Sequence, residues 1–172
     1  MKKVLIVFFT LILVFTFSVV AFGLTSPTVS VNHGVVTGMI VSSPYNGVMI
    51  GAEYGIIQDL AIDGEFGNNL TKLGVKYELN PSIALTGGIL ALGNGASTDP
   101  FIGVNAGSAI NKDFMVLGEI DLTSVSGQFV IMYEAGVKYN IIKQLDIRGG
   151  VLGATGNGAG NTSFELGVAY KF

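Results

Sequence analysis

Apolar residues alternate with small or charged residues along most of the chain. This is the two-residue period of a β-strand whose two faces differ. The pattern is clearest in segments 163–172, 129–141 and 48–56, and no segment after residue 23 has a helical period or an apolar run as long as a membrane helix. The alternation therefore predicts an all-β chain. On the last segment the apolar face carries Phe164, Leu166, Val168, Tyr170 and Phe172.

Turn signals of two kinds alternate along the chain. The tight ones lie at 57–59, 80–82, 111–113 and 142–144, and the longer Ser/Gly/Asn-rich ones lie at 42–46, 67–69, 93–100, 123–127 and 156–162. Ten strands are expected between these turns, most of them near the roughly 9–11 residues that a tilted strand needs to cross a bilayer. They are placed at 28–41, 47–56, 60–66, 71–79, 83–92, 101–110, 114–122, 128–141, 145–155 and 163–172.

This layout predicts an up-and-down antiparallel transmembrane β-barrel with ten strands. Segment 28–41 alternates least regularly and segment 101–110 is weak, so eight strands is the alternative. The direction of the apolar face is a separate question, because a soluble barrel or sandwich turns that face inward. Here the other face carries mainly Gly, Ala and a few charges, which suits a narrow interior better than a wet surface. The apolar face is therefore expected to point outward.

A short repeat supports the barrel. Four strands contain a Gly followed three residues later by Tyr, as in Ile50-Gly-Ala-Glu-Tyr54, and each Tyr comes just before a tight turn or near the last residue. Aromatic rings at one height form a girdle at a membrane interface, where the ring lies in lipid and the hydroxyl in water. The predicted girdle consists of Tyr54, Tyr77, Tyr139 and Tyr170.

Residues 1–23 have the features of a cleaved signal peptide, with Lys2 and Lys3 before an apolar stretch and small residues at Ala21 and Gly23. A permanent membrane helix is the competing interpretation, since the stretch is long enough to span. The leader is favoured because the remaining residues, 24–172, are predicted to form one barrel domain that needs export.

Composition agrees with a membrane location. Hydrophobic residues make up 49% of the chain, charged residues 12%, and the mean hydropathy is +0.60, whereas a soluble domain carries roughly 25% charged residues. Without the leader, seven basic and twelve acidic side chains remain. Such a chain is too acidic for a nucleic-acid partner.

The last strand resembles the C-terminal strand of bacterial outer-membrane barrels, which ends in Phe after apolar residues at every second position. Together with the alternation and the leader, this makes residues 24–172 similar to the small OmpA/OmpX/opacity-type barrels. The resemblance implies the outer membrane of a Gram-negative-type bacterium, contact with its lipid, a monomer, and recognition by the barrel-assembly machinery through Tyr170 and Phe172. Ten strands and short outer loops depart from those relatives. Adhesion or invasion roles, which belong to long loops, are therefore not expected.

Most charges after the leader fall on the face expected to line the lumen, and nine of them are acidic and four basic. Their order predicts pairing of Lys138 with Asp146 across a turn and of Glu65 with Lys76 across another. The thirteen are Glu53, Asp63, Glu65, Lys76, Glu78, Glu119, Asp121, Glu134, Lys138, Asp146, Arg148, Glu165 and Lys171.

Three of these carboxylates, Glu53, Asp63 and Glu78, have no obvious cation. Arg148 is expected diagonal to Glu134 and within reach of Glu165 on the next strand. Two functions follow from this interior. One is an ion-pair network that fills a structural barrel, and the other is a water-filled pore that prefers cations.

Catalytic, cofactor and metal sites are not expected. The chain has no Cys, which excludes thiolate metal sites and cysteine nucleophiles. Its single histidine, His33, lies in the first predicted strand, and the Gly-rich segments 93–95 and 156–160 lack the Lys of a phosphate loop. The expected function is thus a non-enzymatic outer-membrane barrel with a structural or interaction role. The alternatives are the cation-preferring pore and a soluble exported barrel that binds an apolar ligand.

Overall fold

The computed structural model describes residues 24–67, 70–92, 98–125, 127–156 and 159–172. The predicted leader, residues 1–23, and the Gly-rich segment 93–95 lie outside this part of the chain. Within the described residues no helix is long and apolar enough to cross a membrane.

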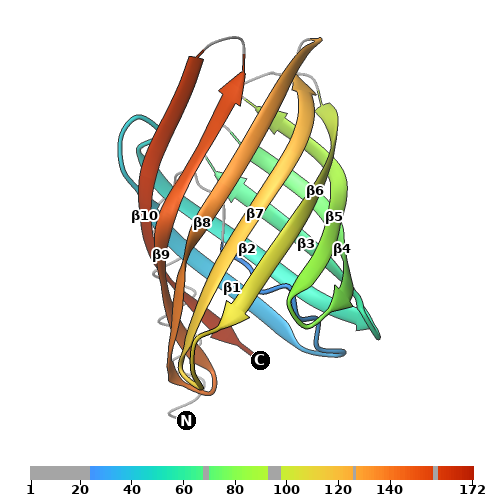
Figure 1. Ribbon diagram of the computed structural model, residues 1–172, viewed down its shortest axis with the longest axis vertical. Helices are drawn as coiled ribbons and strands as arrows, with labels where there is room; N and C mark the ends of the chain where they lie inside the picture. Colours follow the sequence, from blue (N-terminus) through green and yellow to red (C-terminus); the bar gives the residue numbers. More distant parts are fainter. Residues whose placement is uncertain (1–23, 68–69, 93–97, 126, 157–158) are drawn as a thin grey trace.

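Ten antiparallel strands form one closed barrel in which sequence neighbours are also neighbours in space (Figure 1). The ring closes where the first strand pairs with the last, with Ile40 opposite Leu166. This confirms the predicted up-and-down barrel and its ten strands, so the eight-stranded alternative is wrong. The strands are β1 (Gly34–Val41), β2 (Gly47–Ile57), β3 (Leu60–Gly67), β4 (Leu70–Asn80), β5 (Ile83–Leu92), β6 (Thr98–Ala109), β7 (Phe114–Val125), β8 (Gln128–Ile142), β9 (Leu145–Gly156) and β10 (Ala159–Lys171).

The apolar face points outward on every strand. Large apolar side chains such as Ile102 (64% exposed) and Phe164 (72% exposed) stand on the outer surface, while the polar members of the alternation are buried inside. The barrel is thus the reverse of a soluble one, as the small and charged composition of the other face predicts.

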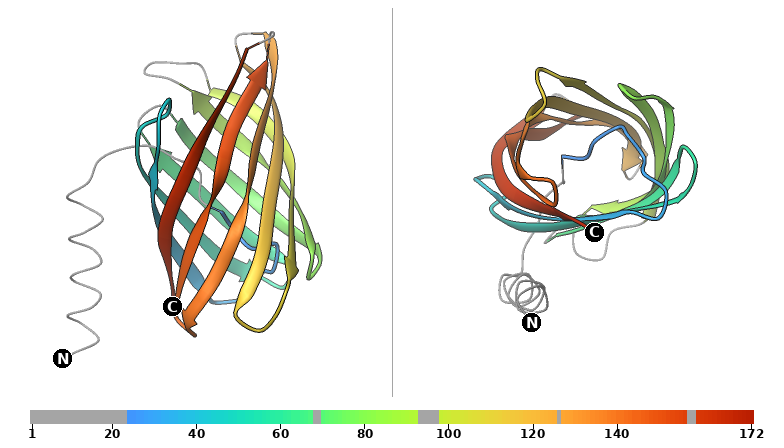
Figure 2. Two further views of the ribbon diagram at one scale, coloured as in Figure 1. Left: turned by 60° about the vertical axis from the view of Figure 1, so that its left-hand side comes forward. Right: turned by 90° about the horizontal axis from the view of Figure 1, so that it is seen from below.

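The first strand begins later than predicted. Strand β1 starts at Gly34 rather than at residue 28, and residues 24–30 run through the interior of the barrel (Figure 2, right panel). Pro27 has no N–H to donate to a neighbouring strand, which disfavours a strand at this point. The chain then turns into β1 at Asn32, whose φ of 58° lies in the left-handed region that Asn tolerates. His33 consequently lies before β1, and the prediction that placed it inside a strand is wrong.

Pairs of glycines allow two strand pairs to approach closely on the inner wall. Gly74 lies opposite Gly88 and Gly136 lies opposite Gly150. A Cβ atom added to Gly88 would stand 2.1 Å from the carbonyl oxygen of Leu73 and 2.6 Å from the Cα of Gly74. Backbone atoms bonded in a ladder cannot move aside cheaply, so these positions require glycine.

The substitution Gly88→Ala is therefore expected to lower the free energy of unfolding by about 1–3 kcal/mol. Gly38→Ala is the matched control, because a Cβ at Gly38 meets nothing within 4 Å. Urea unfolding of the refolded protein, followed by circular dichroism and by the heat-dependent shift in gel mobility, measures both. Equal stability of the two variants would contradict the close approach at Gly88.

Candidate functional site

The lumen is lined by the charges that the alternation assigned to it. Glu53, Asp63, Glu78 and Lys171 are partly buried there. The other nine of the thirteen predicted charges are almost fully buried: Glu65, Lys76, Glu119, Asp121, Glu134, Lys138, Asp146, Arg148 and Glu165.

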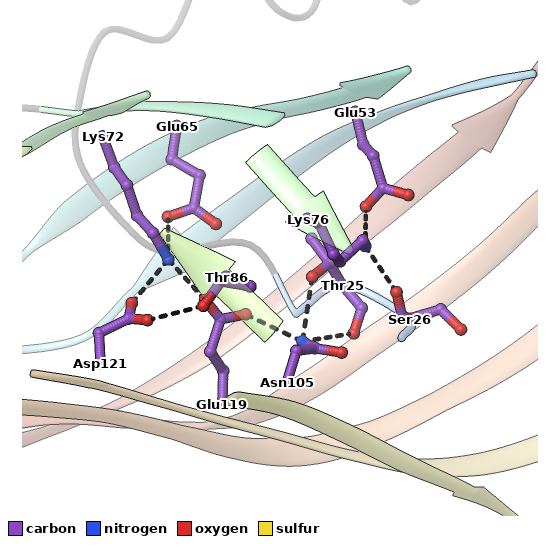
Figure 3. A network of polar contacts seen from close by, with 10 residues as sticks. All are labelled: Thr25, Ser26, Glu53, Glu65, Lys72, Lys76, Thr86, Asn105, Glu119 and Asp121. Atoms are coloured by element: carbon purple, nitrogen blue, oxygen red, sulfur yellow. Dashed lines mark hydrogen bonds and ion pairs between the residues drawn. The ribbon is translucent and has the colours of Figure 1, made fainter. Parts of the chain in front are cut away.

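The centre of the lumen is organised by Lys72 on β4 (Figure 3). Its Nζ lies 2.6 Å from Glu119 Oε1 and 2.7 Å from Asp121 Oδ2, and 4.0 Å from Glu65 Oε2. The ammonium also lies 4.7 Å from the centroid of the Phe101 ring, a distance that allows a cation–π contact. One buried cation thus neutralises carboxylates from β3 and β7 at the same time.

A second cluster joins the wall to the segment inside the barrel. Lys76 Nζ pairs with Glu53 and donates to the carbonyl oxygen of Ser26 at 2.6 Å. Asn105 Nδ2 donates to Glu119 Oε2 at 2.9 Å and to the carbonyl oxygen of Thr25 at 3.2 Å. Figure 3 shows Asn105 joined to the Lys72 cluster through Glu119, while the Lys76 contacts reach the neighbouring residue Ser26 of the same inner segment.

A third cluster lies on β9 and β10. Arg148 Nε donates to Asp146 Oδ1 at 2.7 Å, and Lys171 Nζ lies 2.9 Å from the other oxygen of the same carboxylate. Arg148 Nη1 donates in addition to the carbonyl oxygen of Leu24. Lys171 donates to Asn140 Oδ1 at 2.9 Å. The Asp146 carboxylate therefore forms ion pairs with two cations.

The segment Leu24–Ser30 is the part of the site that the sequence did not predict. Leu24 is 1% exposed, and the backbone N–H of Val29 donates to Glu78 Oε2 at 2.6 Å. Two wall glycines leave room for it, because a Cβ added to Gly136 would meet Leu24 at 2.6 Å and one added to Gly107 would meet Pro27 at 2.9 Å. Side chains from several strands thus hold this segment inside the tight-turn end of the lumen.

A cavity of about 500 Å³ remains beside the segment. Its lining includes Glu53, Asp63 and Glu65 on one side and Lys138, Arg148 and Lys171 on the other. Two residues of the tight turn between β4 and β5, Pro81 and Ser82, also line it. The cavity therefore reaches the tight-turn end of the barrel.

Two predicted ion pairs are wrong because the strand register differs from the expected one. The turn between β8 and β9 lies at Lys143–Gln144, later than the expected centre at Ile142, and a bulge between Asn140 and Ile142 shifts the register by one residue. Together they place Arg148, rather than Asp146, opposite Lys138. Across the turn between β3 and β4, Glu65 lies opposite Lys72 rather than Lys76. A shift of a few residues in a turn is enough to exchange every partner on the strand.

The expected position of Arg148 diagonal to Glu134 is also wrong, because the structure places Leu152 opposite Glu134. Glu165 lies diagonal to Arg148 across β9 and β10, since Gly167 is opposite Arg148. Arg148 binds Asp146 on its own strand instead. Glu53, expected to have no cation, pairs with Lys76.

Lys72 was missed as a lumen residue, although the sequence contained the signal. It lies four residues before Lys76 on the same strand and therefore shares its face. The alternation of strand residues also predicts that Asn105 faces the lumen. Its contacts could not be predicted, because they depend on the segment inside the lumen. In the sequence, the only sign that this segment is not a strand is Pro27, which lies in an irregular first predicted strand.

The four tyrosines lie near the tight-turn end. Tyr54, Tyr77 and Tyr139 are exposed and Tyr170 is half-buried. Phe172 is exposed, and its backbone N–H donates to the carbonyl oxygen of Gly34 at 3.0 Å. His33 is exposed, with Nδ1 2.8 Å from the carbonyl oxygen of Val31. Among the described residues, no group of three or more His, Cys, Asp or Glu side chains is arranged to hold a metal ion.

No protein-family model matches the chain, and no curated protein matches it. Among solved structures it is similar to the NanC porin at 14% identity, with 81% of this chain and 100% of that chain covered and a TM-score of 0.49. The N-terminal β-barrel domain of Pseudomonas aeruginosa OprF is 14% identical, with 83% and 98% covered and a TM-score of 0.43. The Yersinia pestis outer membrane protein Ail is 13% identical, with 82% and 99% covered and a TM-score of 0.46. The likeness is one of fold alone.

Replacing Lys72 tests the central cluster. Lys72→Met leaves three buried carboxylates without their cation, so we expect a loss of about 3–5 kcal/mol in the free energy of unfolding. Neutralising two of those carboxylates as well, in Lys72→Met/Glu119→Gln/Asp121→Asn, should recover part of that loss.

Urea unfolding of the refolded variants measures the effect. The control is Lys112→Met, because the Lys112 side chain is 89% exposed and lies 3.7 Å from Asp113 in a turn, where an ion pair adds little stability. If Lys72→Met were as stable as Lys112→Met, the central role of Lys72 would be refuted.

Proposed function

We propose that this protein is an outer-membrane β-barrel. The observation that carries the proposal is the outer surface, where every strand exposes large apolar side chains. A soluble protein rarely exposes an apolar patch larger than roughly 300–600 Å², whereas this belt encircles a barrel. A closed sheet also satisfies its backbone hydrogen bonds internally, as a hydrocarbon environment requires.

The same proposal covers several expectations from the sequence. Residues 1–23 serve as a cleaved leader, and the four tyrosines Tyr54, Tyr77, Tyr139 and Tyr170 form the girdle at the side of the short turns, which in such barrels faces the periplasm. The barrel-assembly machinery recognises the last strand through Tyr170 and Phe172. The mature protein is a monomer related to the small OmpA/OmpX/opacity-type barrels.

The barrel is closed at rest and has a structural or interaction role without catalysis. Support comes from the lumen, where the Lys72 and Lys76 clusters and the segment Leu24–Ser30 occupy the space between opposite walls. The charged interior and the apolar exterior together disfavour the soluble barrel with an apolar ligand. Buried ion pairs would be a poor lining for such a ligand.

A small cation-preferring pore is the second candidate. It is favoured by the cavity of about 500 Å³ at the tight-turn end and by the excess of carboxylates in the lumen. Carboxylates along a narrow path raise the local concentration of cations. On this view the segment Leu24–Ser30 would have to leave the lumen before current flows.

The membrane location is tested on the outer face. Ile102→Lys places a charge on the apolar belt and is expected to lower the free energy of folding into lipid vesicles by about 2–4 kcal/mol. Ile110 is equally exposed, at 65% against 64%, but lies at the turn after β6. Ile110→Lys is therefore expected to cost about 0–1 kcal/mol.

Folding into vesicles of a phosphatidylcholine with medium-length acyl chains, followed in urea by the heat-dependent gel shift, measures both variants. Similar effects of the two lysines would count against a bilayer around the barrel. So would a wild-type protein that stays in the aqueous fraction without detergent.

The closed lumen is tested by expelling the inner segment. Leu24→Asp/Pro27→Asp adds two charges where the side chains are buried, so the segment is expected to leave the barrel. Planar-bilayer recordings should then show stable steps of cation-selective current, whereas the wild type should show none.

Ser30→Asp is the control, because that side chain is already exposed, and it should behave like the wild type. Steady current through the wild-type protein would contradict the closed barrel and support the cation-preferring pore. Anion preference in the opened variant would reject an acidic conduction path.

A further inference from the structure

The cavity at the tight-turn end lies between two walls of opposite charge. Strands β8, β9 and β10 contribute Lys138, Arg148 and Lys171, while β2 and β3 contribute Glu53, Asp63 and Glu65. Strand β1 lies between them and contributes the uncharged Val35 and Thr37. Opposite charges on facing walls create a field across the cavity, which orients any solute that carries separated charges.

The basic wall contains a cation without a partner. The carboxylate of Asp146 is occupied by Arg148 at 2.7 Å and by Lys171 at 2.9 Å. Lys138 lies beside them and is 9% exposed, and within the described residues no hydrogen bond or ion pair reaches its ammonium group. Asp146 therefore pairs with two of the three cations, and the third, Lys138, is a buried side chain that lines the cavity.

The acidic wall has the complementary surplus. Glu53 is paired with Lys76, but Asp63 Oδ1 has no hydrogen-bond partner in the described part of the chain. Asp63 lies in register with Glu53, Glu53 with Val35, and Val35 with Lys171. The Asp63 backbone is therefore three strand spacings from that of Lys171, which is roughly 14 Å along the sheet.

Small side chains create the space between the two walls. Thr37 on β1 lies in register with Gly51 on β2 and with Ala169 on β10, and all three face inward and are buried. A volume of about 500 Å³ falls within the range of small-molecule sites, roughly 300–1,000 Å³. The tight-turn residues Pro81 and Ser82 in its lining give it a mouth at that end.

We propose that this cavity binds a small zwitterionic solute, with its carboxylate on Lys138 and its ammonium group toward Asp63. A simple anion would meet the Lys138 wall but would be repelled by Glu53, Asp63 and Glu65. A simple cation would be repelled by the opposite wall. Only a solute that carries both charges matches both surpluses. The inference rests on the proposed function in one respect, that the tight-turn end faces an aqueous compartment.

The test uses the refolded mature protein in detergent micelles and three probes of equal length. These are 5-aminopentanoate, which carries both charges, pentanoate, which carries the negative one, and pentylammonium, which carries the positive one. Isothermal titration calorimetry should show the zwitterion binding about tenfold more tightly than either singly charged probe, since each charge-assisted contact adds about that factor.

Two substitutions assign the two ends of the solute. Lys138→Gln should reduce the affinity for the zwitterion about tenfold without weakening the binding of pentylammonium. Asp63→Asn should also reduce the affinity for the zwitterion about tenfold, but without weakening the binding of pentanoate. Lys138→Arg keeps the charge and should retain binding. Lys143→Gln is the matched control, because Lys143 is exposed in the next turn, and it should change nothing.

On the wild type, saturation transfer from the probe to the Lys138 side chain should be seen by NMR, which needs no variant to fold. Equal affinity for the three probes, or wild-type affinity in Lys138→Gln with its gel shift intact, would overturn the proposal. Neither result would affect the bilayer recordings or the vesicle folding, so the site and the proposed function fail separately.

Discussion

The closure of the sheet is the constraint on which the rest of the structure depends. Strand β1 pairs with β10 over seven residue pairs, from Val35 with Lys171 to Val41 with Glu165, and this seam leaves no strand edge to bond elsewhere. Without such an edge the outer surface can be almost wholly apolar, because no backbone donor or acceptor has to face it. The same alternation then places the buried charges of the strands in one narrow interior.

That interior explains why the charges are so few and so interconnected. A buried charge is costly unless it is paired and hydrogen-bonded. Lys72 pairs with more than one carboxylate, and Asp146 pairs with two cations. Asn105 donates hydrogen bonds both to Glu119 of the barrel wall and to Thr25 of the inner segment. Acidic side chains outnumber basic ones, and Glu53, Asp63 and Glu65 lie at the cavity, where water or a solute can reach them.

The fold could be predicted because it follows from a period of two and from turn residues, both of which are local properties of the sequence. The direction of the faces followed from their composition. The ion pairs could not be predicted in the same way, since they depend on register. The turn at Lys143–Gln144 and the bulge at Asn140–Ile142 together place Arg148 opposite Lys138, and no local signal fixes the bulge. The inward direction of Lys72 was predictable, because it lies four residues from Lys76 on the same strand. The inner segment was not, because its contacts come from strands far apart in sequence, including β4, β6, β8 and β9.

The segment Leu24–Ser30 has a consequence for the order of assembly. It lies inside a ring that is closed by the pairing of β1 with β10, the two strands farthest apart in sequence. Contacts between such distant parts of a chain form late. A barrel that closed before the segment entered would leave the buried Lys76, Asn105 and Arg148 side chains without its carbonyl acceptors, which costs free energy. We therefore expect the open sheet to curl around the segment Leu24–Ser30 before the last seam forms.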